Sequence, residues 1–344
     1  MFKDRLNNYR EIEKRRDSKL LVYITGDRPG LETQIHPEIL DYFIEHLDQL
    51  GKEKRISLLL YTRGGNTLAA WSLVNLIRQF CDDFEVIIPA KAHSAGTLIS
   101  LGANKIIMTK QATLGPIDPS LNTPLNPQNP LNPNNPASRV PVSVESIKGY
   151  FQLAQQDLKI NTEKDLKDIL INLSNQVHPL VLGDTYRART QIQMLAKKLL
   201  SKQNLKPENI EKIISFLCSD SGSHDYTIYR REAKDELGLN IEKPDDAFYK
   251  IIKETMDDIK RELELNTPFN PSSFLGGNST GDYSFRRVLI ESIKGGTHVF
   301  ATEGTLIKTL QNIPQQHPLP PIQRTLFDDQ RKFEGWKYEE KNIN

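Results

Sequence analysis

The segment RISLLLYTRGGNTLAAWSLVNLIRQF, from Arg55 to Phe80, carries the pattern that decides the fold. Arg55 to Thr62 is rich in β-forming apolar residues, and it stops at the pair Gly64 and Gly65. The apolar residues of Leu68 to Phe80 then predict a helix. A buried strand followed by a glycine turn and a helix is typical of an α/β sheet with parallel neighbours.

The same alternation of strands and helices continues on both sides of this segment, from Lys19 to about Ser120. The expected strands are Leu20 to Thr25, Phe84 to Pro89 and Lys105 to Thr109, and the expected helices are Glu38 to Leu50 and Ala95 to Leu101. Buried strands that alternate with helices argue for an α/β fold with mainly parallel pairing.

Helices are expected to dominate the chain from Ser143 to about Leu265. Their expected ranges are Ser143 to Leu158, Glu163 to Leu173, Leu180 to Ser201 and Pro207 to Leu217. Ile192, Leu195 and Leu199 form an apolar stripe on the third of these helices. Such a stripe indicates packing, either between subunits or within one compact chain.

Two other segments differ from this core. Phe2, Leu6, Tyr9 and Ile12 recur at helical spacing, which predicts a short amphipathic helix that packs on a partner subunit or frays. Asn122 to Pro136 alternates asparagine and proline, which is typical of an extended surface loop. We expect an inert insertion there, with a lid over a site as the alternative.

The expected organisation has three parts. An N-terminal helix covers residues 1–18, and a main α/β domain covers residues 19–265, with a helical arm from residue 143. Residues 266–344 are expected to hold a hairpin around Gly295 and Gly296, followed by a polar tail from Pro314 to Asn344.

Composition excludes several classes of protein. The 344 residues carry a formal charge of +1, which gives no support to a nucleic-acid partner. Two cysteines, Cys81 and Cys218, exclude a disulfide framework and a cysteine-based zinc site. No apolar run approaches the ~20 residues that cross a bilayer, and Met1 to Asp17 is too charged for a secretory signal. We therefore expect a cytoplasmic protein without a membrane span.

Two turns between a strand and a helix place groups that chemistry can use. Gly64 and Gly65 let a ligand approach the backbone and leave unpaired N–H groups at a helix N-terminus, where an anion or oxyanion binds well. Ser94 lies in a second such turn, beside the small residues Ala95 and Gly96. Its hydroxyl either acts as a nucleophile, as in a nucleophile elbow, or caps the following helix.

Four motifs in order carry a family resemblance. They are TRGG at 62–65, AHSAGTLI at 92–99, LGPIDP at 114–119 and SHDYTI at 223–228. Together they resemble the serine dehydrogenase proteinase family, in the Clp/crotonase superfamily near signal peptide peptidase A. The resemblance covers roughly residues 20–241. It implies a spiral of ββα units with a helical C-terminal arm, a serine peptidase activity, a peptide or protein substrate, and assembly into a homo-oligomer.

The resemblance also implies roles for individual residues. Ser94 would be the nucleophile, and the amides of Gly65 and Ala95 would form the oxyanion hole. Gly64 and Gly96 would line the substrate groove. Arg63 would line it too, although it stands where the family usually has proline, which alters the groove beside the glycines. Thr227 departs from the family in the same way, because it replaces the proline that usually follows the tyrosine.

The base that takes the proton of the serine stays open. The segment where Clp peptidases carry their histidine offers Asp118 and no histidine. Lys148 follows the Asn/Pro loop at a separation comparable with the lysine of signal peptide peptidase A relatives, and its alternative is a solvated helix lysine. His224 beside Asp225 is the second candidate, with a structural role as the alternative.

Asp184 matches an aspartate that the family carries before its long helix, although a carboxylate favoured by the helix dipole is a simpler explanation. No metalloprotease motif, calcium loop, Walker loop or dinucleotide fingerprint occurs, so we expect neither a metal nor a cofactor. Two other functions stay open beside the peptidase. One is an oligomeric scaffold of the same fold that has lost its base, and the other is acyl-CoA thioester chemistry, which an elbow serine disfavours.

Overall fold

The computed structural model describes residues 1–117, 120–203, 205–220, 225–313 and 322–339. Within them, eight strands form one sheet in the order β10-β5-β3-β2-β1-β11-β12-β13. The strands are β1 (Lys19–Thr25), β2 (Glu53–Tyr61), β3 (Cys81–Ile88), β5 (Lys105–Met108), β10 (Ile241–Glu242), β11 (Thr280–Ser292), β12 (Gly296–Ile313) and β13 (Ile322–Glu339). Strands β10 to β1 pair in parallel, and β11 to β13 pair antiparallel. The expected α/β sheet with mainly parallel core strands is confirmed.

Helices cover both faces of the parallel part. Their bounds are α1 (Phe2–Arg16), α2 (Ile39–Leu50), α3 (Thr67–Ile77), α4 (Ala95–Leu101), α5 (Val144–Gln152), α6 (Glu163–Gln176), α7 (Pro179–Leu200), α8 (Pro207–Ser215), α9 (Asp246–Glu262) and α10 (Pro271–Leu275). Side chains of β1 alternate between two cores, because neighbours in a strand face opposite ways. Leu21 and Tyr23 join α2, α3, α4, α7 and α8, whereas Leu20 and Val22 join α1 and α9. The described residues also form three π-helical turns: η1 (Leu153–Asp157), η2 (Phe216–Asp220) and η3 (Glu232–Glu236).

A second set of short pairings runs beside the carboxyl ends of the main strands. Ile35 bridges Gly65, Thr62 bridges Ala92, and β4 (Lys91–Ala92) pairs with β6 (Thr113–Leu114), all in parallel. Strand β9 (Ile228–Tyr229) joins β6 on its other side. Each main strand is thus followed by a short extended segment, and after β1, β2 and β3 a helix comes next. This arrangement is the spiral of ββα units that the resemblance implies.

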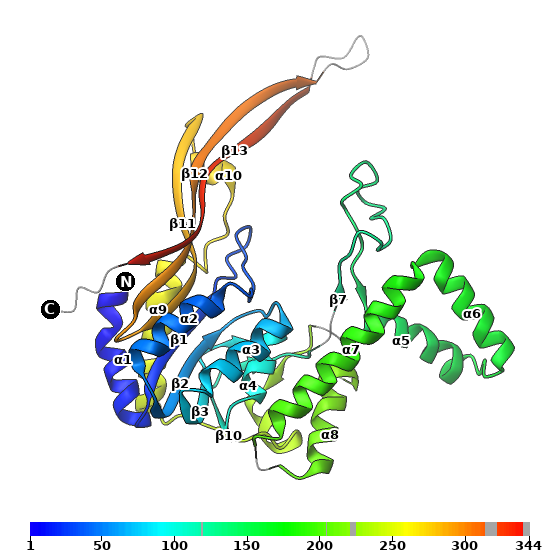
Figure 1. Cartoon of the computed structure of the whole chain (residues 1–344). Helices are drawn as coiled ribbons and strands as arrows, with labels where there is room; N and C mark the ends of the chain where they lie inside the picture. Colours follow the sequence, from blue (N-terminus) through cyan, green and yellow to red (C-terminus); the bar gives the residue numbers. More distant parts are fainter. Residues whose placement is uncertain (118–119, 204, 221–224, 314–321, 340–344) are drawn as a thin grey trace.

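The C-terminal part differs from the expected tail. The hairpin around Gly295 and Gly296 is confirmed, since β11 and β12 meet there. However, β11 pairs with β1, so this part of the chain continues the central sheet. Within the expected tail, the described residues form β13. This strand pairs with β12 over its whole length. Figure 1 shows β12 and β13 rising from the body as a long ribbon.

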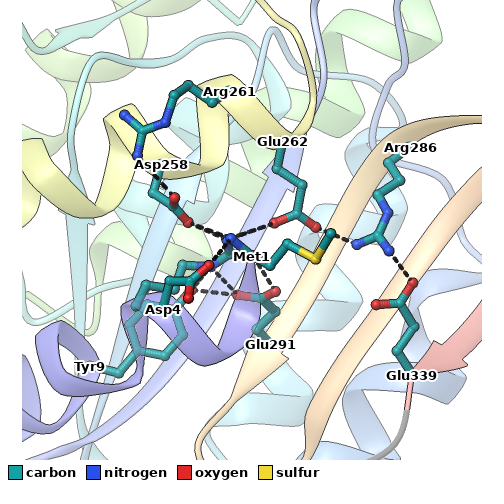
Figure 2. Close-up of polar contacts among 10 residues, drawn as sticks. Met1, Asp4, Tyr9, Asp258, Arg261, Glu262, Arg286, Glu291 and Glu339 are labelled. Atoms are coloured by element: carbon teal, nitrogen blue, oxygen red, sulfur yellow. Dashed lines mark hydrogen bonds and ion pairs between the residues drawn. The ribbon is translucent and has the colours of Figure 1, made fainter.

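Helix α1 is fastened to its own chain by a buried group of charges (Figure 2). The Arg5 side chain, which is fully buried, donates to both carboxylate oxygens of Glu291 on β11, at 2.5 and 3.0 Å, and to Asp258 and Glu262 on α9, each at 2.7 Å. Tyr9 donates to the same Glu291 carboxylate. Phe2, Leu6, Tyr9 and Ile12 are buried against β1 and α9, so the alternatives of a frayed end and of a helix packed on a partner are both wrong.

A helical arm extends from the body on the side opposite α1 (Figure 1). Strands β7 (Ser120–Leu121) and β8 (Val142–Ser143) lead into and out of the Asn/Pro loop, and α5, α6 and the first half of α7 follow. The second half of α7 packs on α4 and α8. Ile192, Leu195 and Leu199 are buried there, so this stripe packs within the chain.

Candidate active site

Ser94 occupies a strained turn between β4 and α4. Its backbone has φ 50° and ψ −114°, a combination that a residue with a side chain rarely adopts. The Ser94 carbonyl starts the helix by accepting the Leu98 N–H at 3.1 Å. The side chain makes no capping hydrogen bond, so a helix cap does not explain this serine. Such strain holds a partly exposed hydroxyl at the tip of a turn, as a nucleophile requires.

Gly64 lies directly against Ser94. It has φ +113°, and a Cβ at this position would lie 2.7 Å from Ser94 Cβ and 3.2 Å from the Ala95 nitrogen. A Cβ on Gly96 would come within 2.4 Å of Thr62 Cγ2. The glycines predicted to line the groove are therefore required by close packing between the two turns.

Two backbone amides of the turns around Ser94, those of Gly65 and Ala95, were predicted to form an oxyanion hole. Ala95 is the first residue of α4, where N–H groups have no partner within the helix. The Gly64 carbonyl accepts the Ile35 N–H at 2.8 Å. Because the C=O and N–H of a trans peptide point in opposite directions, the Gly65 N–H points away from Ile35. Neither the Gly65 nor the Ala95 amide donates a hydrogen bond to a residue that the structure describes.

Ile35 is a contributor that the sequence interpretation missed. Its N–H binds Gly64, its carbonyl accepts the Asn66 N–H at 2.9 Å, and a Cβ on Gly65 would lie 2.4 Å from its nitrogen. Ile35 thus fixes the back of the glycine turn. The only signal in the sequence is an apolar residue in a mostly polar loop, which also contains Leu31, and it does not point to this role.

Charged groups flank the glycine turn on the α9 side of the sheet. Asp27 accepts hydrogen bonds from Tyr61 at 2.7 Å and from Lys91 at 2.6 Å. Burial and the hydrogen bond to Asp27 raise the pKa of Tyr61. Arg63 is exposed beside Gly64 and makes no ion pair with a described residue. The Lys91 side chain is thus engaged by Asp27 in an ion pair.

The candidates for the base lie in several places. Lys148 is on α5, and its Nζ lies 4.0 Å from Glu145 Oε2. Figure 1 places α5 in the arm, whereas α4, which follows Ser94, lies in the body. His224 and Asp118 fall outside the described residues. Asp225 is described and exposed. Ser94 Oγ makes no hydrogen bond with a described residue.

Two other residues near the motifs, His93 and Asp184, contact other side chains of the chain. His93 Nε2 lies 2.9 Å from Thr113 Oγ1 on β6, and Gly115 lies against its ring. Asp184 lies beyond the first turn of α7, is half-exposed and faces Arg187 at 3.8 Å. The helix dipole acts mainly within the first turn, so it does not explain Asp184. Among the residues described, no group of three or more His, Cys, Asp or Glu side chains could hold a metal ion.

Comparisons with known proteins identify a family for this chain. The model of the ClpP-like SDH-type serine proteinase family matches residues 1–128. The uncharacterized protein MJ0137 of Methanocaldococcus jannaschii is 30% identical over 244 residues, which is 69% of this chain and 73% of that protein. The uncharacterized protein MJ1495 of the same organism is 26% identical over 245 residues, which is 69% of this chain and 71% of that protein.

Solved structures are more distant. A variant of the 1510-N membrane-bound stomatin-specific protease is 16% identical, with a TM-score of 0.37 over 72% of this chain and 86% of that one. ClpP1 from Listeria monocytogenes is 16% identical, with a TM-score of 0.35 over 69% of this chain and 99% of that one. Within the described residues, no helix is long and apolar enough to span a membrane. On the family match and its relatives, this chain belongs to the ClpP-like SDH-type serine proteinase family.

Proposed function

We propose that this chain is a serine peptidase that cleaves peptide bonds through an acyl-enzyme on Ser94. One observation carries the proposal: Ser94 is held at φ 50° without capping its helix, beside two amides that donate to no described residue. A strained turn that presents a free hydroxyl next to free N–H groups suits attack on a carbonyl. Capping of α4 does not account for the strained turn at Ser94.

The proposed reaction has two steps. Ser94 Oγ attacks the substrate carbonyl while a base takes its proton, and the Gly65 and Ala95 N–H groups donate to the resulting oxyanion. The tetrahedral intermediate collapses, the amine leaves with the proton from the base, and the acyl group stays on Ser94. Water then attacks the ester with help from the same base and releases the carboxylic acid. The two amides contribute only where negative charge develops, so they lower the barrier without tightening substrate binding.

Lys148 and His224 remain the proposed alternatives for the base. A lysine must be neutral to accept the proton, whereas a histidine is neutral near pH 7 without help. We therefore propose to measure peptide hydrolysis against pH for Lys148→Met and His224→Gln. The variant that removes the base loses activity at every pH, and the other keeps the wild-type profile. Lys164→Met, on exposed helix α6, is the matched control for the loss of an arm lysine.

Peptide hydrolysis by the purified full chain tests the function itself. Ser94→Ala is expected to abolish turnover of a peptide library. Ser100→Ala is the matched control, because Ser100 is buried on the same helix and donates to Gly96 at 2.8 Å without facing the turn. Equal turnover by wild type and Ser94→Ala would contradict the proposal.

A second candidate function is an oligomeric scaffold without catalysis. Its supporting observation is that Ser94 Oγ contacts no base among the described residues. Under this alternative, neither wild type nor Ser94→Ala hydrolyses any peptide, and both assemble in the same way. Hydrolysis by wild type alone excludes it.

We also propose that the protein forms a homo-oligomer in the cytoplasm. Helix α6 has no buried residue, although Leu170 and Ile171 are apolar and about half-exposed. Leu180 and Tyr186 on α7 are more exposed still, at 63% and 70%. So much apolar surface on one arm favours coverage by another copy of the chain. Cys81 and Cys218 are both buried and form no disulfide with each other, which suits a reducing compartment.

A further inference from the structure

Thr62 contacts both turns of the candidate site, although it belongs to neither. It follows β2 and is fully buried. Its N–H donates to the Lys91 carbonyl and its carbonyl accepts the His93 N–H, each at 3.1 Å, so its backbone holds the segment that leads to Ser94. Its methyl group packs against Gly96 behind the nucleophile.

The hydroxyl of Thr62 serves the other turn. Oγ1 accepts the Gly64 N–H at 3.0 Å and the Thr25 hydroxyl at 2.7 Å. With two donors on its oxygen, the Thr62 proton is left to point to the Gly64 carbonyl, 3.4 Å away. Thr25, at the end of β1, is also fully buried, so its hydroxyl fixes the orientation of Thr62.

These hydrogen bonds determine where the oxyanion donor points. Thr62 binds the N–H of Gly64, and Ile35 binds its carbonyl, so the peptides on both sides of Gly64 are held. The Gly65 N–H is then the free group of the turn, and its direction follows from the fixed Gly64–Gly65 peptide plane. Displacing such a donor weakens the oxyanion contact steeply, because the contact depends on a preorganised geometry.

We propose that Thr62 is a positioning residue for catalysis: its hydroxyl, oriented by Thr25, sets the Gly65 amide relative to Ser94. This inference rests on the proposed peptidase function and adds a residue to it. Thr62 touches no substrate atom and acts only through Gly64 and the Ser94 turn. Thr62 opens the motif at 62–65, but the sequence assigns it no role, because it supports the site from a buried position.

The test compares Thr62→Val, which removes the hydroxyl and keeps the methyl group, with Thr62→Ser, which does the reverse. Thr62→Val is expected to lower kcat by at least about tenfold with KM within about twofold of wild type, because the oxyanion contact forms only in the transition state. Thr62→Ser is expected to stay within about threefold of the wild-type kcat, since the hydroxyl remains. Thr255→Val removes another fully buried threonine hydroxyl, on α9, and is the control for a general effect on folding.

Hydrogen exchange supplies a readout that does not depend on activity. In Thr62→Val, amides of residues 63–68 are expected to exchange faster than in wild type, while Thr62→Ser and Thr255→Val leave them unchanged. Unchanged exchange and kcat in Thr62→Val overturn the inference, as does an equal loss in Thr62→Ser or in Thr255→Val. If wild type hydrolyses nothing while the exchange pattern holds, the peptidase proposal fails and the support of the glycine turn by Thr62 stands.

Discussion

Gly64 is the residue at which a single substitution tests the proposed site most simply. Its φ of +113° and the 2.7 Å approach to Ser94 Cβ exclude a side chain. We predict that Gly64→Ala lowers peptide hydrolysis at least about tenfold, because the added methyl group displaces the nucleophile from the oxyanion donors. Steady-state kinetics on the folded variant provides the measurement.

A control variant at Gly51 separates the effect of the contact with Ser94 from the effect of backbone strain. Gly51 also has a positive φ, of +76°, but no heavy atom lies within 4 Å of a Cβ there. Gly51→Ala carries a similar strain without touching the site, so it should keep wild-type kcat. If the two variants lose the same activity, the close contact with Ser94 has no catalytic meaning.

At the scale of single elements, Arg5 decides whether α1 stays on the body. Its fully buried guanidinium neutralises Glu291, whose side chain is buried as well. Burial opposes the charged form of Arg5, but Tyr9 and Glu291 outweigh it and raise its pKa. We predict that Arg5→Met lowers the free energy of unfolding by about 3–5 kcal/mol, because Glu291 is left buried and unpaired.

Chemical denaturation measures this loss. The double variant Arg5→Met with Glu291→Gln should recover much of the stability, since it removes both charges. Arg10→Met, on the exposed face of α1, should change the unfolding free energy by less than about 0.5 kcal/mol. A loss in Arg10→Met as large as that in Arg5→Met contradicts the assignment.

A chain of polar groups joins α2 to β12 and makes stability depend on pH. His46 Nδ1 lies 2.8 Å from Ser292 Oγ, His46 Nε2 lies 3.0 Å from His298 Nδ1, and His298 Nε2 lies 3.1 Å from Glu45. Burial lowers the pKa of His298 below its ordinary value of 6.5, although Glu45 acts in the opposite direction.

The sign of the effect follows from proton binding. Below pH 6.5 the unfolded chain takes up a proton at His298 that the folded chain still lacks. The contribution of His298 to the unfolding free energy is therefore present above pH 6.5. It is lost as the pH falls toward the pKa of His298 in the folded chain, by at most about 1.4 kcal/mol per pH unit.

We predict that His298→Gln flattens the decrease in unfolding free energy between pH 7 and pH 5, measured by urea denaturation at several pH values. His36→Gln, whose side chain is 66% exposed, should keep the wild-type slope. A slope in His298→Gln equal to that of wild type rules out His298 as the source.

The elements were predictable from sequence in proportion to their burial. β1, β2, β3 and β5 are buried on both faces, so each forms a short apolar run between turn residues. β13 was missed because its described side chains are exposed or half-exposed, and charged residues such as Asp328 and Arg331 mask the strand pattern. The turns that hold Ser94 and the glycines were predictable because turns constrain residue type. Thr62 and Ile35 were not predicted to support the site, because their contacts depend on segments that only the fold brings together.

At the scale of the whole molecule, the arm exposes several large apolar side chains, among them Leu170 and Ile171 on α6. We predict that light scattering gives a mass that is a multiple of 39.3 kDa. Replacing Leu170 and Ile171 with lysine should lower the order of assembly, since both are apolar and exposed on α6. Asp168→Lys, on the same helix, also introduces a lysine but removes no apolar surface, and it should assemble normally. A wild-type monomer at micromolar concentration contradicts this prediction.

Covalent labelling shows whether Ser94 is the nucleophile. Wild type is incubated with a serine-reactive fluorophosphonate, and the adduct is located by peptide mass spectrometry. We predict one adduct, on Ser94, that is absent from Ser94→Ala and retained in Ser100→Ala. An adduct on another serine, or labelling that survives Ser94→Ala, would contradict it.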